Sequence, residues 1–214
     1  MKPLVNIIVE NEGFLIKNPM NFDCIKIMPK NIYKIPNIPF YHSLWAYEGT
    51  LIKPNITELQ DCITNAYGKL SKLTPMVACP ADSLPVDIRL LEETFEICGL
   101  PNPKLISKSS LLALNGVPHY ISISASERLV ILEWYNNREP IETRYYSKSA
   151  VNKNKLLTDI NNIRYKQQGG NINIFIFDGC NELKELYELG ECINANQMME
   201  LLQKAGNSIF SSGK

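Results

Sequence analysis

The segment TPMVACPADSLPVDIRLLEETFEICGLPNPKLISKSSLLALNGVPHYISISASERLVILEWYNNREPIETRYY, residues 74–146, decides the fold. It opens with a short apolar run, continues with a stretch of helical spacing that stops at Gly99, and then holds a second short strand pattern. Three longer strand patterns follow Gly116 and are separated by turn residues. Strands that alternate with helices form parallel sheets, whereas strands joined by short turns pair antiparallel. The segment therefore predicts an α/β protein that passes from a parallel arrangement into an antiparallel meander.

The expected elements inside this segment have short, well-separated patterns. They are strands at 74–79, 104–106, 118–124, 129–135 and 139–146, and helices at 84–98 and at 109–115, the latter capped by Ser109.

Working outward, the N-terminal side predicts a hairpin followed by a mixed region. Strands are expected at 4–9, 14–17, 24–28 and 47–52, with Gly13 in the hairpin turn, and a helix at 57–70 capped by Asn55 or Thr57. The C-terminal side predicts helices at 152–168, 182–189 and 197–205 and a strand at 171–177, with Asp178 capping the helix at Glu182. A structural duplication is expected around residues 116–118.

Composition excludes several classes of function. Lys and Arg total 22, as do Asp and Glu, so no basic field points to nucleic acid. No apolar run approaches the roughly 20 residues of a membrane helix, and no secretory signal opens the chain, which favours a cytoplasmic location. The six cysteines form no C-x-x-C pair, and His42 and His119 have no partners at ligand spacing, so no metal site is expected.

Three local patterns carry a family resemblance. The first joins MVACP at 76–80 to KLIS at 104–107 and SLLALNG at 110–116; the second is ISISAS at 121–126; the third is IFIFDGCNEL at 174–183. Their order resembles the actin-like, ribonuclease-H-like superfamily of actin, large heat-shock chaperones and sugar kinases. The resemblance implies two abbreviated ribonuclease-H-like halves, residues 1–117 and 118–214, with mixed sheets flanked by helices.

The turns that hold nucleotide in that superfamily are altered here. Residues 10–13, ENEG, stand in place of Asp-x-Gly-x-Thr/Ser, and Ser122 and Ser124 stand at the aspartate and glycine positions of the second phosphate loop. Lys108-Ser109 replaces a Glu-Pro helix opening, and only Gly179 remains of a triple-glycine adenosine turn. Phosphate loops need glycines for close backbone approach and carboxylates for the metal, so we expect no cofactor and no catalytic residues. Glu10 and Glu12 are the remaining candidates for contact with a cation.

The length and order most resemble the actin-like assembly-platform proteins of type IV pili and type II secretion. The resemblance implies a non-catalytic scaffold, peripheral to the inner membrane, that binds membrane assembly proteins or an assembly ATPase; a homodimer is a further option. Exposed aromatic residues are the expected partner-binding positions: Phe40, Tyr41 and Trp45 in a proline-rich segment, and Trp134 and Tyr135 at a strand end. A core position is the competing interpretation of Trp134.

Two enzymatic alternatives stay open. One is an active actin-like ATPase or sugar kinase with diverged phosphate loops. The other is an unrecognised enzyme that uses Ser122, Ser124 or Ser126 near His119, although no G-x-S-x-G motif surrounds these serines. Alternating serines in a strand otherwise indicate a half-exposed face.

Overall fold

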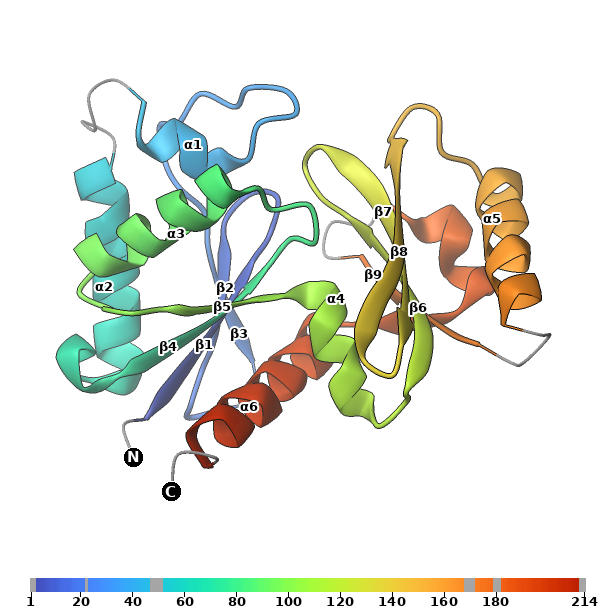
Figure 1. The fold of residues 1–214 in the computed structure, drawn as a ribbon. Coiled ribbons are helices and arrows are strands. Elements are labelled where there is room, and N and C mark those ends of the chain that lie inside the picture. The colour runs from blue at the N-terminus through green and yellow to red at the C-terminus, as the bar shows by residue number, and fades with distance from the viewer. Residues whose placement is uncertain (1–2, 22, 47–51, 168–171, 179–181, 212–214) are drawn as a thin grey trace.

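The chain folds into two lobes that lie side by side, each built on a five-stranded mixed sheet (Figure 1). The computed structural model describes residues 3–21, 23–46, 52–167, 172–178 and 182–211. The sheet of the first lobe, sheet A, has the order β3-β2-β1-β4-β5. Its strands are β1 Leu4–Val9, β2 Phe14–Lys17, β3 Cys24–Ile27, β4 Thr74–Cys79 and β5 Lys104–Ser107.

The second lobe repeats this topology, which confirms the expected duplication. Its sheet, sheet B, has the order β10-β9-β6-β7-β8. Its strands are β6 His119–Ala125, β7 Leu129–Asn136, β8 Glu139–Ser147, β9 Asn173–Phe177 and β10 Glu191–Ile193. In each sheet an antiparallel meander of three strands continues into two parallel strands. The prediction of two mixed sheets flanked by helices is therefore confirmed.

Helices cover the outer face of each sheet. In the first lobe these are α1 Phe40–Leu44, α2 Ile52–Tyr67 and α3 Pro85–Ile97, with the short 3-10 helix η2 Leu70–Lys72 after α2. In the second lobe they are α5 Lys153–Lys166 and the 3-10 helix η4 Lys184–Leu189 (Figure 1). Between the sheets lie α4 Lys108–Leu111, the 3-10 helix η3 Leu112–Asn115 and α6 Ala195–Ser211.

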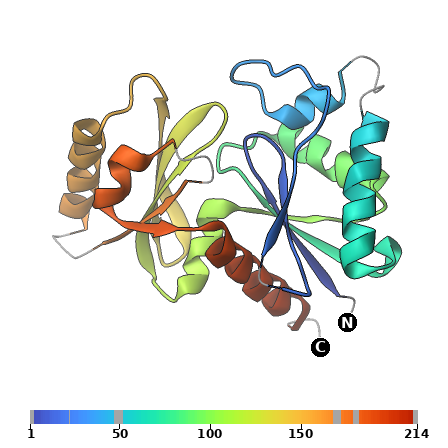
Figure 2. The same cartoon turned by 180° about the vertical axis from the view of Figure 1, so that it is seen from behind.

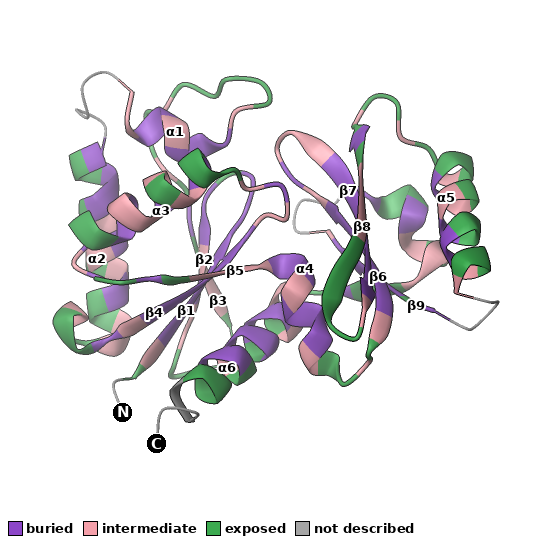
Figure 3. Ribbon diagram, viewed as in Figure 1, coloured by how far each residue is buried: buried purple, intermediate pink, exposed green. Residues whose placement is uncertain are grey.

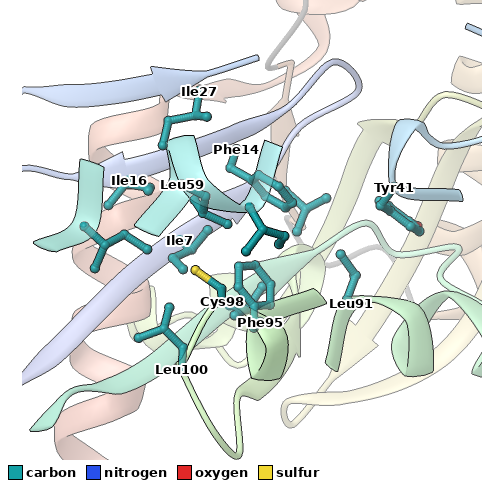
Figure 4. Close-up of a cluster of buried hydrophobic side chains, with 14 of the residues drawn as sticks. Ile7, Phe14, Ile16, Ile27, Tyr41, Leu59, Leu91, Phe95, Cys98 and Leu100 are labelled. Atoms are coloured by element: carbon teal, nitrogen blue, oxygen red, sulfur yellow. The ribbon is translucent and has the colours of Figure 1, made fainter. Parts of the chain in front are cut away.

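The central strands are buried on both faces, which explains their unbroken apolar runs. Ile7 points to the outer face of sheet A, where it joins Phe14 and Phe95 in the cluster drawn in Figure 4. Its neighbour Ile8 points the other way, into a second cluster between the two sheets. A third cluster lies between sheet B and α5. Figure 3 shows burial concentrated along these strands and on the inward sides of the helices.

Helix α6 belongs to the second half of the sequence but packs on the first sheet (Figure 2). Its Gln203 accepts a hydrogen bond from Asn6 of β1 over 2.8 Å. A Cβ on Gly206 would lie 2.6 Å from Leu4 Cδ1 and 3.2 Å from Met76 Cγ, so glycine permits this close approach. A division at residue 117 thus separates the two sheets but assigns α6 to the lobe on which it does not mainly pack.

Helix boundaries account for most of the corrections. Helix α2 begins at Ile52, not at 57, so the strand expected at 47–52 is wrong at its last residue, and residues 47–51 lie outside the described part. Asn55 and Thr57 therefore lie inside the helix. Asn55 instead accepts from the backbone N–H of Lys30 over 2.7 Å.

Smaller differences concern the other ends. Ser109 is not a cap: α4 follows Ser107, and neither serine makes a side-chain cap there. Residues 184–189 form a 3-10 helix, α6 is longer than expected at both ends, and α1 and β10 were not predicted.

Candidate functional site between the lobes

Several strand ends and turns meet where the two lobes face each other. The first lobe contributes the β1–β2 turn at residues 10–13, the loop at 80–84 and the start of α3. The second contributes the β6–β7 turn at residues 126–128, and α4 begins between the two sheets. Because carboxyl ends of parallel strands gather at one edge, this is the place where a ligand of an α/β fold would be expected.

Arg128 of the β6–β7 turn reaches across to a buried carboxylate of the first lobe. Its two terminal nitrogens donate to Asp87 Oδ2 and Oδ1 over 2.7 and 2.8 Å. Asp87 lies in the first turn of α3 with a side chain that is 0% exposed. A bidentate arginine–carboxylate pair of this kind is strong and directional.

Asp87 has two further partners, both in its own lobe. Its Oδ2 accepts the backbone N–H of Leu84 over 2.7 Å, which caps α3, and its Oδ1 lies 2.5 Å from His42 Nε2. Burial by itself would raise the pKa of Asp87, but the hydrogen bonds from Arg128, His42 and Leu84 together outweigh it and lower the pKa. The carboxylate is thus held ionised inside the protein.

Two more contacts fasten the same turn to the first lobe. Ser126 Oγ donates to Asp82 Oδ2 over 2.7 Å and also accepts the backbone N–H of Leu129 over 3.0 Å. Lys34 Nζ lies 3.7 Å from Glu127 Oε1. We call Asp82, Asp87, Ser126 and Arg128 the interlobe latch.

A second charge pair lies deeper between the sheets. Lys108, only 4% exposed, places Nζ 3.8 Å from Glu10 Oε1 and 4.8 Å from the ring centre of Phe177. The lysine thereby links the first turn of the chain to a strand of the second lobe. Glu10 Oε1 and Asn11 Nδ2 are buried and make no hydrogen bond. Lys108 occupies the helix opening where the resemblance would place a glutamate.

Next to this pair is a buried polar group made by β6, β7 and α4. Ser122 Oγ donates to Ser109 Oγ over 3.1 Å, and Tyr120 donates to the carbonyl of Ser109 over 3.0 Å. The rings of Tyr120 and Tyr135 stack with centres 4.7 Å apart. Burial raises the pKa of Glu133, whose Oε2 has no hydrogen-bond partner.

The serines expected on a half-exposed face are buried instead. Ser122, Ser124 and Ser126 are each at most 5% exposed, because the first lobe and α4 cover this face of sheet B. His119 lies at the opposite end of β6 from Ser126. The structure therefore does not bring His119 to Ser126 in the manner of a hydrolase triad.

The five aromatic residues expected to bind a partner lie mostly in the core. Phe40, Tyr41, Trp134 and Tyr135 are at most 7% exposed, which confirms the core interpretation of Trp134. Trp45 is half-buried and donates from Nε1 to Thr94 Oγ1 over 3.1 Å. Phe40 and Tyr41 are buried because α1 packs on α3, so that their rings fill the space between helix and sheet. Trp134 and Tyr135 are buried because both faces of β7 are covered. Partner binding through the four buried rings would require local opening and stays a prediction.

The carboxylates of Asp178 and Glu12, which were candidates from the sequence, form hydrogen bonds or ion pairs within their own lobes. Asp178 accepts the backbone N–H of Glu182 over 2.9 Å and of Leu183 over 2.8 Å. Its expected capping role is nevertheless wrong, because η4 begins only at Lys184 and has no side-chain cap. Glu12 is half-exposed and lies 3.6 Å from Lys34 and 3.8 Å from Lys26. Within the described ranges, no three His, Cys, Asp or Glu side chains gather to hold a metal ion. Gly179 lies outside the described residues.

Sequence reasoning missed the interlobe latch. Asp87 three residues after Leu84 fits an N-terminal capping position, but nothing in the local pattern pairs it with Arg128, 41 residues later. Likewise, Lys108 was noticed as a replacement, whereas its pairing with Glu10 depends on the relative placement of two strands.

Comparisons with known proteins identify the fold through structure alone. Neither the family models nor the curated proteins contain a match to the sequence. Among solved structures, MreB5 of Spiroplasma citri bound to ADP aligns with a TM-score of 0.55 at 9% identity, covering 100% of this chain and 97% of that one. The AlfA filament bound to AMPPNP gives 0.53 at 11% identity, covering 99% of both chains. The ethanolamine utilization protein EutJ from Carboxydothermus hydrogenoformans gives 0.51 at 8% identity, covering 92% and 86%.

Such low identity establishes similarity of fold and nothing finer. The chain has a two-lobed, actin-like fold, as predicted. Across the described residues, no helix is both long enough and apolar enough to cross a bilayer.

Proposed function

We propose that this chain is a non-catalytic, actin-like scaffold that acts by binding other proteins. Its partners would be components of a bacterial membrane assembly such as a type IV pilus or type II secretion platform, including an assembly ATPase, at the cytoplasmic side of the inner membrane. The fold is similar to that of nucleotide-binding proteins, but the side chains between the lobes are suited to holding the lobes together.

One observation supports this proposal: the charged side chains between the lobes are already paired with one another within the chain. Lys108 neutralises Glu10, and Arg128 is fully engaged by Asp87. Phosphoryl transfer needs positioned metal, a phosphate cradle and a group that orients the nucleophile. Here the first residue of α4, Lys108, is a cation. In the turn at 126–128, the side chains of Ser126 and Arg128 donate hydrogen bonds to Asp82 of the first lobe.

The alternative, an actin-like ATPase or sugar kinase, draws support from the ligands of the structural neighbours. MreB5 is bound to ADP and AlfA to AMPPNP in the structures compared above. The two functions differ in one measurable property, the affinity for magnesium nucleotide.

Thermal unfolding with increasing magnesium ATP and magnesium ADP tests the choice. A ligand present at 100 times its Kd stabilises the folded state by about 2.7 kcal/mol, which raises Tm by several degrees in a chain of this size. The scaffold hypothesis predicts no rise in Tm with either nucleotide, even in large excess over the protein. A reproducible rise, together with release of phosphate, would favour the enzyme.

If Tm rises with nucleotide, two variants in the β1–β2 turn show whether the nucleotide binds between the lobes. Glu10→Gln alters the carboxylate beside Lys108, whereas Glu12→Gln alters a half-exposed carboxylate of the same turn that lies 3.6 Å from Lys34 and 3.8 Å from Lys26. A nucleotide held between the lobes should lose affinity in the first variant and keep it in the second.

Partner identity calls for chemical crosslinking in intact cells followed by mass spectrometry. The proposal predicts enrichment of membrane-anchored assembly proteins. Recovery of soluble metabolic enzymes alone, with no membrane protein, would contradict it.

A further inference from the structure

A cavity of about 360 Å³ lies where α6 meets the second lobe. Its lining includes Asn115, between the two sheets, and Ile193 and Gln197, on either side of the turn from β10 into α6. The backbone passes from sheet A to sheet B through residues 108–118 and returns through residues 194–195, so both crossings border the cavity. Because α6 packs on sheet A, a ligand in this cavity would touch both lobes at a place separate from the interlobe latch.

Part of the lining is apolar and belongs to the core between the sheets. Phe175 of β9, Ile193 of β10 and Leu201 of α6 form this apolar wall, and each is at most 4% exposed. A volume of this size, with an apolar wall and a few polar groups, is usual for a site that binds a small molecule. The wall can therefore bury an aliphatic group.

Three charged side chains of the lining are unpaired. Glu191 of β10 and Glu200 and Lys204 of α6 form neither an ion pair nor a side-chain hydrogen bond with another described residue. The spacing of Glu200 and Lys204 favours a pair, because a glutamate four residues before a lysine is the more stabilising order on a helix. On α3, Arg89 and Glu93 have the same spacing in the less favourable order and do pair, over 2.7 Å. The charges at the cavity are therefore available to a ligand.

We propose that this cavity binds a free amino acid with an aliphatic side chain, such as leucine. The ammonium group pairs with Glu191 and Glu200, the carboxylate pairs with Lys204, and the side chain packs on the apolar wall. Residues four apart on a helix have Cβ atoms about 5–6 Å apart, so Glu200 and Lys204 are spaced to meet the two charges that an amino acid carries on one carbon. The side-chain amides of Asn115 and Asn173 belong to the same lining and supply donors for the carboxylate.

The charges of the lining disfavour other ligands. Two carboxylates against one ammonium leave an excess of negative charge, which repels phosphates and other anions. Within the described part of the chain, no third His, Cys, Asp or Glu joins Glu191 and Glu200 to hold a metal ion. A free amino acid uses all three charged side chains, whereas a residue inside a peptide has lost both charges of its backbone. The inference is independent of the scaffold proposal, because it uses neither the interlobe latch nor the β1–β2 turn.

Titration of the full chain at pH 7, followed by nuclear magnetic resonance, tests the site with leucine and two analogues. 3-Methylbutylamine keeps the aliphatic body and the ammonium group, and 4-methylpentanoate keeps the body and the carboxylate. Leucine should bind saturably in the millimolar range or tighter, as expected for a ligand of fewer than about ten non-hydrogen atoms, and should shift the side-chain amide signals of Asn115 and Asn173. Each analogue should bind about threefold more weakly or worse. Absence of saturable binding of leucine, or analogues that bind as tightly as leucine, would overturn the proposal.

Two variants at exposed positions assign the two charges of the ligand. Glu200→Gln should weaken leucine binding about threefold or more without weakening that of 4-methylpentanoate, whereas Lys204→Gln should weaken leucine binding without weakening that of 3-methylbutylamine. The control Glu96→Gln changes an exposed glutamate of α3, outside the cavity, and should leave all three affinities unchanged. A leucine affinity that is the same in all three variants, or that falls equally in all three, would refute the assignment.

Discussion

Replacing Arg128 by methionine isolates the contribution of the interlobe latch. Arg128→Met keeps much of the apolar stem but removes both hydrogen bonds to Asp87, whose side chain is 0% exposed. A buried carboxylate that loses its charge partner typically costs about 3–5 kcal/mol. His42 and the N–H of Leu84 remain beside Asp87, so we expect a loss of about 2–4 kcal/mol in the free energy of unfolding.

An exposed pair in the same chain serves as the matched control. Arg89 donates from Nε to Glu93 Oε1 over 2.7 Å, the same length as the bond from Arg128, but these side chains are 65% and 33% exposed. Surface pairs of this kind contribute about 0–1 kcal/mol. Arg89→Met should therefore change stability little. Urea unfolding followed by circular dichroism and by tryptophan fluorescence measures both losses.

The latch should also depend on pH in a defined direction. The folded state lowers the pKa of Asp87, so the stabilisation is complete above the ordinary aspartate pKa of about 4 and is lost as the pH falls through the folded pKa. The difference between wild type and Arg128→Met should shrink in acid. Equal losses for Arg128→Met and Arg89→Met, or a difference that does not change between neutral and acidic pH, would refute the reasoning.

Two further outcomes follow from buried positions. Burial raises the pKa of Glu133, so the stability of the wild-type protein should fall as the pH rises through that folded pKa. The Glu133→Gln variant should lose this pH dependence and should be at least as stable as wild type at pH 7. Urea unfolding of both proteins at pH 5 and pH 8 measures the difference. Gly206→Ala should lower the free energy of unfolding by about 1–3 kcal/mol despite the higher helix propensity of alanine, because its Cβ would press on Leu4 and Met76; an unchanged midpoint in urea would contradict the close packing of α6.

The strands could be predicted because their pattern is strong over several residues. Runs such as residues 4–9 and 74–79 are apolar on both faces, and both faces are indeed covered. The missed strand β10 has three residues, two of them exposed, and so carries no such pattern. The duplication was predicted because each half repeats hairpin, helix and parallel strand in the same order.

Helix starts were harder to predict because the same residue type can occur in a loop, at a helix cap or inside a helix. Asn55 and Thr57 suggested caps of a helix starting at 57, yet α2 begins at Ile52 and includes Pro54 in its first turn, where proline is tolerated. The side chain of Asn55 instead forms hydrogen bonds with the backbone of Lys30. Tertiary packing, not propensity, decided this boundary.

Most contacts of the candidate site could not be predicted from local sequence patterns. Arg128 and Asp87 are distant in sequence and meet only when the lobes are placed against each other. The serines of β6 alternate as a half-exposed face would, and the opposite lobe buries them. What the sequence did indicate was the replacement at Lys108, because the change of charge is visible without coordinates.

The return of α6 to sheet A has a consequence for how the chain matures during synthesis. Ile8, Met76 and Ala78 face a cluster that includes Met198, Leu201 and Leu202. During synthesis the five strands of sheet A are translated well before α6, so the apolar face that α6 covers stays exposed to solvent until α6 has been made. Contacts of such wide sequence separation form late and slowly. The apolar face of sheet A is therefore covered only after the residues of the second lobe have been translated.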